Sequence, residues 1–147
     1  MVKIRTIERV ICGKVKERFL LKSAESQAVN FLFVHNKPGQ SSDISICVIA
    51  TNKANIKVNA TVKIEKTAPQ TNTYLSIKAF SEAGATIEAS PNLEINNNLV
   101  SAGHSLTTRY IDKEELFYLT SRGISKSVAK KIIIDGLIKP YKDGVIL

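Results

Sequence analysis

The chain has 147 residues, the length of one ordinary domain, and 44% of them are hydrophobic, which argues against a disordered chain. The net charge of +8 would suit an anionic partner, but the basic residues are spread along the sequence without a dense run. The sequence holds no N-terminal apolar segment and no run of about 20 apolar residues, so we expect a soluble cytoplasmic protein with reduced thiols.

Alternation of apolar and polar residues predicts strands through most of the first 96 residues. The clearest run is 56–64, where apolar and polar residues alternate without a break. Further strands are predicted at 2–10, 18–22, 29–34, 44–50, 74–80, 85–89 and 93–96. Their spacing of about 10 to 15 residues suits a sandwich, a barrel or a β-solenoid, and no fixed-period repeat decides between these.

The last third of the chain predicts two short helices. Asp112 and Glu115 have the spacing of a capping box at the start of the first helix, and Gly123 is placed to end it. Ser125 can cap a second helix, which we expect to end at Gly136. Because only a few residues separate the two helices, they should form a compact αα-hairpin.

The residue types needed for catalysis or for a metal centre are not grouped in the sequence. Cys12, Cys47, His35 and His104 do not have the spacing of a structural zinc site. The sequence also lacks a phosphate-binding G-x-x-x-x-G-K-[ST] loop and a nucleophile elbow around a serine. We therefore expect a protein that is not an enzyme.

The segment 104–136 reads HSLTTRYIDKEELFYLTSRGISKSVAKKIIIDG and resembles the C-terminal signature of the SufB/SufD family of SUF iron–sulfur cluster assembly scaffold proteins. It shares a histidine, an acidic helix start, an LFYL-SRGI block and an aliphatic helix followed by glycine. Upstream, 91–95 resembles the family's P-x-LEI segment, and 35–38 with Ser42 resembles its H-x-A-P…S opening. The resemblance covers about residues 29 to 141.

This resemblance implies a mainly β chain with a right-handed parallel β-helix core at 1–111 and a C-terminal helical subdomain at 112–147. It also implies a non-catalytic scaffold that pairs through its β-helix, either with a SufB-like protein or with a second copy of itself. The C-terminal helices would dock a SufC-like ATPase. The residues expected at that docking surface are Leu116, Phe117, Leu119, Arg122, Gly123, Lys126 and Lys130.

The histidine of the signature falls on His104, which the resemblance makes the candidate for cluster assembly and for metal ligation. Without the resemblance, a lone histidine is more often structural or simply exposed. The family's assembly cysteine has no counterpart in 75–81, and Ala102 replaces another family cysteine, so the chain looks closer to the SufD type. We therefore expect no cofactor held stably by this chain alone, and at most an iron–sulfur cluster shared transiently with a partner.

Two other roles remain open for the helical hairpin, and one other interpretation remains open for the whole chain. It could simply cover an open end of the β stack. It could act as a helix-turn-helix in a small basic nucleic-acid-binding module, with Ser125, Lys126 and Ser127 facing the bases. No aromatic or arginine-rich platform accompanies such a module here. The chain could also be a reduced domain that has no remaining partner.

Overall fold

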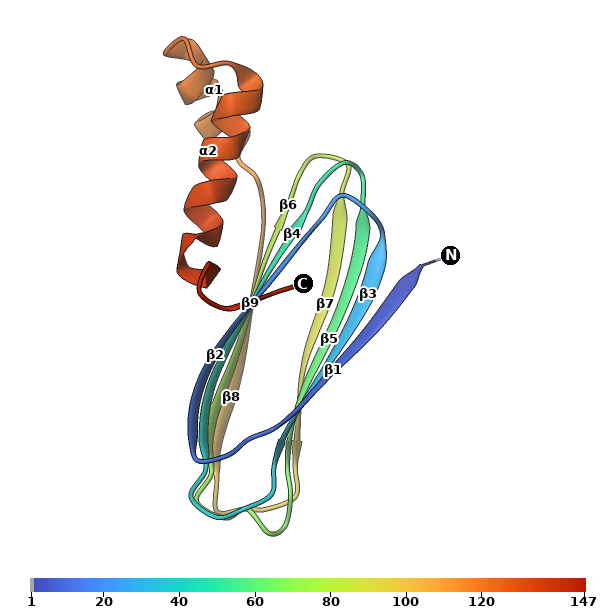
Figure 1. Cartoon of the computed structure of the whole chain (residues 1–147), viewed down its shortest axis with the longest axis vertical. Coiled ribbons are helices and arrows are strands. Elements are labelled where there is room, and N and C mark those ends of the chain that lie inside the picture. The colour runs from blue at the N-terminus through green and yellow to red at the C-terminus, as the bar shows by residue number, and fades with distance from the viewer. Residues whose placement is uncertain (1) are drawn as a thin grey trace.

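The computed structural model describes residues 2–147, which form a parallel β-solenoid followed by two helices and a short final strand (Figure 1). This confirms the prediction of a mainly β chain with a solenoid core and a C-terminal αα-hairpin. The elements are β1 (Lys3–Val10), β2 (Lys14–Ser23), β3 (Gln27–His35), β4 (Ser41–Ala50), β5 (Asn55–Ile64), β6 (Asn72–Ser81), β7 (Thr86–Ile95), β8 (Ser101–Tyr110), α1 (Lys113–Ser121), α2 (Lys126–Ile138), the 3₁₀ helix η1 (Lys139–Tyr141) and β9 (Val145–Ile146).

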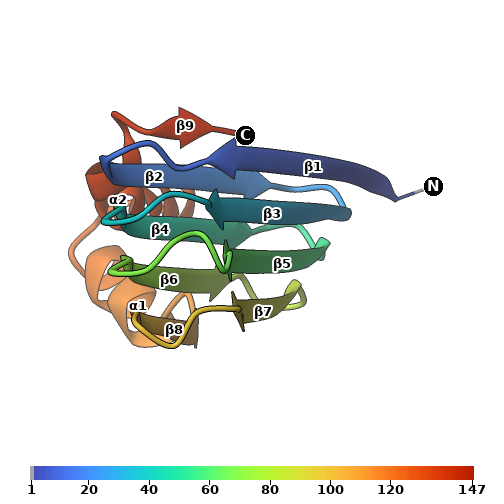
Figure 2. The same ribbon diagram turned by 90° about the horizontal axis from the view of Figure 1, so that it is seen from below.

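Among β1 to β8, the odd-numbered and the even-numbered strands form two separate parallel sheets, and β9 joins the even-numbered one. Sheet A has the order β1-β3-β5-β7, and sheet B has the order β8-β6-β4-β2-β9. One strand from each sheet makes one coil, and the coils stack along the molecule (Figure 2). In sheet A, Lys3 pairs with Gln27, Gln27 pairs with Ile56 and Asn55 pairs with Thr86, so successive coils advance by 24, 29 and 31 residues. Because the coil length varies at the turns, the sequence shows no fixed period.

The core lies between the two sheets and is filled by the inward-facing side chains of each strand. Its centre is a cluster of Phe19, Phe31 and Phe33, which are almost completely buried, with ring centroids 5.2 to 6.0 Å apart. Aromatic pairs at this spacing contribute about 0.5 to 1.5 kcal/mol each beyond the area they bury. The strict alternation of 56–64 becomes β5, in which every second residue is buried.

The strand predictions differ from the structure at the last coil and at the C-terminus. The predicted strands 85–89 and 93–96 belong to one continuous strand, β7, which runs through Pro91. Since β7 is an edge strand of sheet A, a proline is tolerated there. The strands β8 and β9 carry little apolar alternation and were not predicted.

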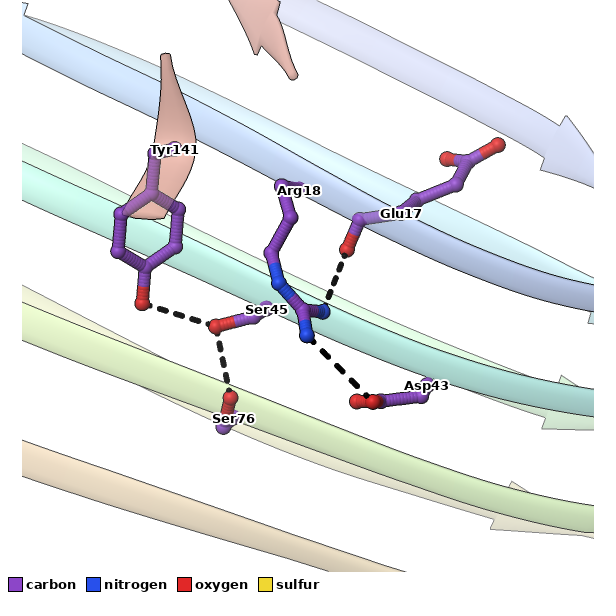
Figure 3. A network of polar contacts seen from close by, with 6 residues as sticks. All are labelled: Glu17, Arg18, Asp43, Ser45, Ser76 and Tyr141. Carbon is purple, nitrogen blue, oxygen red and sulfur yellow. Dashed lines mark hydrogen bonds and ion pairs between the residues drawn. The ribbon is translucent and has the colours of Figure 1, made fainter. Parts of the chain in front are cut away.

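The C-terminal segment packs mainly on the outer face of sheet B, through α2 and η1, and its last strand, β9, covers part of the first coil. The Tyr141 hydroxyl lies 2.9 Å from Ser45 Oγ, which accepts a hydrogen bond from Ser76 at 3.0 Å (Figure 3). Strand β9 then pairs with β2, so the segment leads from the last coil back to the first. The buried residues of this second cluster are Leu20, Cys47, Ile49, Phe80, Ile134 and Tyr141.

The predicted helix starts are present, with changes of detail. Asp112 accepts a hydrogen bond from the Glu114 amide at 2.8 Å, whereas Glu115 pairs with Arg109 and does not complete a capping box. Gly123 has φ +85 and follows α1, as expected for a helix-ending glycine. The expectation that Gly136 ends the second helix was wrong, because α2 continues to Ile138. No helix in residues 2–147 is long and apolar enough to cross a bilayer.

Candidate functional site

The last coil of the solenoid, β7 with β8, has no further coil stacked on it within residues 2–147. The inward-facing residues of these two strands continue the columns of the core but are only partly covered. Leu93 packs against the core from β7, and Leu106 on β8 is 41% exposed. We call this surface the open end; its inward-facing apolar residues are Ile87, Ala89, Leu93, Ala102 and Leu106.

His104 lies in β8, at the open end. It is in register with Leu75, a buried residue of β6, so the alternation of the strand places His104 on the inner face of sheet B. The residue is nevertheless exposed, since no coil covers β8. No group of three or more His, Cys, Asp or Glu side chains is placed to hold a metal ion anywhere in the described part of the chain. Further ligands to a metal bound at His104 would therefore have to come from a partner.

The structure brings neither cysteine to His104. Cys47 is buried beneath the C-terminal segment, and this burial raises the pKa of its thiol to about 12, although Lys78 partly opposes the shift. Such a thiol stays protonated and is a poor metal ligand near neutral pH. Cys12 is exposed after β1, in the first coil, whereas His104 is in the last.

The helical hairpin exposes large hydrophobic side chains. On α1, Phe117 is 73% exposed and Tyr118 is 56% exposed, while Leu116 and Leu119 are partly buried. No residue of α1 is buried. A groove between the helices is lined by Asp112, Glu114, Glu115, Tyr118, Leu119 and Ile133. The hairpin therefore offers an apolar surface with an acidic rim.

Sequence reasoning missed part of this surface. The sequence pattern does not single out Val128 and Ile132 of α2, which are about half exposed, while the buried residues of this helix are Ala129 and Ile134. The i, i+4 spacing of Val128 and Ile132 shows that they share a face, but it cannot show which face contacts the sheet. Together with Phe117 and Tyr118, they form what we call the hairpin surface.

The basic candidates of the hairpin have different surroundings. The Arg122 guanidinium lies 4.8 Å from the centre of the Tyr118 ring, a cation–π contact. The Lys130 ammonium forms an ion pair with Glu82, which follows β6, and so joins α2 to the solenoid. Lys126 is exposed at the start of α2.

A second histidine has a structural position. His35 is completely buried, and its Nε2 lies 2.9 Å from Ser42 Oγ, which lies 2.7 Å from Thr73 Oγ1. Burial lowers the pKa of His35. His35 and Ser42, which carry the resemblance of this segment, are therefore hydrogen bonded to each other inside the core. They lie in the coil of β3 and β4, whereas the open end is the coil of β7 and β8.

Comparison with known proteins identifies relatives of this arrangement. A family model described as "SUF system FeS cluster assembly, SufBD core domain" matches residues 5–137. The chain is similar to an iron-sulfur cluster assembly SufBD family protein of Mycobacterium tuberculosis, 44% identical over 54 residues, which are 36% of this chain and 14% of that protein. It is also similar to one of Staphylococcus aureus, 28% identical over 109 residues, which are 74% of this chain and 23% of that protein. The matches span less than a quarter of these relatives.

Proposed function

Because the chain belongs to the SufBD core-domain family, we propose that it is a non-catalytic scaffold component of SUF-type iron–sulfur cluster assembly. Membership of the family supports a role in cluster assembly. The structural observation that supports the scaffold role is the open end, where an exposed histidine lies on an edge strand beside partly uncovered apolar residues. An iron–sulfur cluster would be cargo shared with a partner at this surface.

The open end supports pairing through the β-helix, with a SufB-like chain or with a second copy. Strands β7 and β8 have free edges, and apolar side chains such as Leu93 and Leu106 lie between them. Burying one large aliphatic side chain contributes about 1.5 to 3 kcal/mol, so a few such residues can hold two coils together. His104 would then lie inside the interface, within reach of ligands from the partner.

Pairing is tested with Leu106→Asp, which places a carboxylate in the apolar part of the open end. We expect self-association, or binding to a SufB-like chain, to weaken at least about tenfold, measured by sedimentation velocity. Ile4→Asp is the matched control, because Ile4 is 69% exposed in the first coil. Association that is unchanged in Leu106→Asp would refute pairing at this surface.

The hairpin surface supports docking of a SufC-like ATPase. Its exposed aromatic and aliphatic residues belong to neither buried hydrophobic cluster of residues 2–147, and no residue of α1 is buried. In a pull-down with a SufC-like ATPase, Phe117→Asp should lose binding while Ile4→Asp retains it. Since Phe117 is exposed, the variant should fold normally, which circular dichroism verifies. Equal capture of both variants would exclude this surface.

The role of His104 is tested by anaerobic reconstitution of the paired protein with iron and sulfide. We expect His104→Ala to lose most of the visible absorbance of the bound cluster. Thr107→Ala, an exposed change on the same strand, should keep it. If the His104 variant loads as much cluster as the native protein, His104 is not a ligand.

A further inference from the structure

The positive charge of the chain is concentrated in its first coil. Residues 2–23 carry seven Lys or Arg and two Glu, which gives +5 of the total +8. Residues 24–112 carry seven basic and seven acidic side chains, so the rest of the solenoid is neutral. Acidic residues are about equally frequent in the two segments, so the difference comes from the higher density of basic residues in the first coil.

Strand β1 presents these charges beside a free edge. It pairs with β3 on one side, and no strand in residues 2–147 pairs with its other side. Lys3, Arg5 and Arg9 are in register with core-facing residues of β3, so they lie on the inner side of the strand. The outer side carries Ile4 and Val10, which are 69% and 60% exposed. The inner side of β1 therefore carries three basic residues and Ile7, and Thr6 and Glu8 lie between Ile4 and Val10 on the outer side.

Most of these basic side chains have no acidic partner. Arg18 forms an ion pair with Asp43, with 3.6 Å between Nη2 and Oδ2 (Figure 3). None of the other six basic residues of the first coil is in an ion pair among residues 2–147. Their charge is thus available to a ligand.

We propose that the free edge of β1 binds an extended acidic segment of another protein, which adds to sheet A as a further strand. The unpaired backbone N–H and C=O groups of β1 would supply the hydrogen bonds of the added strand. Acidic side chains on one face of the segment would meet Lys3, Arg5 and Arg9. Aliphatic side chains on its other face would cover Ile4 and Val10. The ligand is therefore a strand in which acidic and aliphatic residues alternate.

Other occupants fit the edge less well. The open end of a second copy would bring apolar residues such as Leu93 against Lys3, Arg5 and Arg9, and burying unpaired charges is unfavourable. A nucleic acid could use the charge but cannot continue a β-ladder. The first coil also has no exposed aromatic ring for base stacking, because its one aromatic residue, Phe19, is fully buried.

The probe for this edge is a synthetic octapeptide of alternating Glu and Val, with a peptide of the same composition in two blocks as its control. We expect salt-sensitive binding of the alternating peptide, measured by fluorescence anisotropy. Arg5→Glu/Arg9→Glu should weaken binding at least about tenfold. Lys113→Glu/Lys131→Glu changes the net charge equally on exposed positions of the helices and should leave the affinity within about twofold.

Hydrogen exchange of the native protein gives a second readout that needs no variant. Peptide binding should slow exchange in residues 3–10 and leave β7 and β8 unchanged. The proposal is overturned if the alternating peptide does not bind at low salt, if both double variants bind it equally, or if β1 gains no protection. It is also overturned if a single-stranded DNA oligonucleotide binds the first coil and the peptide does not.

Discussion

The two ends of the solenoid are built from the same kind of coil but present opposite chemistry. At the first coil, the inner side of β1 carries Lys3, Arg5 and Arg9. At the last coil, the same register positions of sheet A carry Ile87, Ala89 and Leu93. Inward-pointing charges on an edge strand disfavour stacking of another apolar coil, whereas the apolar end favours it. The inward-facing charges of the first coil thus disfavour head-to-tail stacking of two copies.

The largest difference between the regions should appear in core substitutions. Phe33→Ala removes a fully buried ring from the aromatic cluster and should lower the free energy of unfolding by about 3 to 5 kcal/mol. Leu93→Ala, at the partly covered open end, should cost only about 1 to 2 kcal/mol in the unpaired protein. Urea denaturation measures both. Equal losses would show that the last coil is packed as tightly as the interior.

A smaller effect is expected where β9 covers part of the first coil. A Cβ at Gly144 would lie 2.2 Å from the Arg18 carbonyl oxygen, so Gly144→Ala forces β9 away from β2. We expect a loss of about 1 to 3 kcal/mol in thermal or urea unfolding. Gly136→Ala is the control, because a Cβ there meets nothing within 4 Å and alanine favours a helix by about 0.5 to 1 kcal/mol. A neutral Gly144→Ala would mean that β9 is not held closely.

The buried histidine His35 makes the stability of the interior depend on pH. Burial lowers the pKa of His35 below its ordinary value of 6.5, so the unfolded chain binds more protons in the window just below 6.5. Stability should be constant above that window and fall as the pH drops through it. Denaturation midpoints between about pH 8 and about pH 5 measure this fall.

His35→Gln keeps a polar side chain near Ser42 and should remove the part of this pH dependence that comes from the interior. His104→Ala, measured in parallel, reports any contribution from the exposed histidine of the open end. If the denaturation midpoint of His35→Gln still falls as the pH drops, the pH dependence comes from other groups.

Much of the fold could be predicted because β-branched residues alternate strictly in the middle coils, as in 56–64. The last coil was harder to predict, because an edge strand with one covered side needs few apolar residues, and β8 reads as SAGHSLTTRY. Strand β9 has two residues, and its partner β2 is more than a hundred positions away, a distance that local patterns do not report. The resemblance supplied His104 as a candidate, but only the coil stack shows that it lies at an uncovered end.

The concentration of charge in the first coil was also hidden in the sequence. Lys and Arg occur in every third of the chain, so counting them predicts an evenly basic surface. The asymmetry comes from basic residues, because the 22 residues 2–23 carry seven of them and the longer segment 24–112 carries only seven more, some of them in pairs such as Lys57 with Glu88. It becomes visible only when residues are grouped by coil.

The pairing of β9 with β2 has a consequence for how the molecule unravels. In a simple stack, each coil contacts only its neighbours, and melting can begin at either terminus and spread one coil at a time. Here the last residues of the chain add to the first coil through Val145 and Ile146. Because β9 pairs with β2, loss of the C-terminal strand also removes a contact of the first coil. The N-terminal and C-terminal segments should therefore unfold together as one cooperative unit.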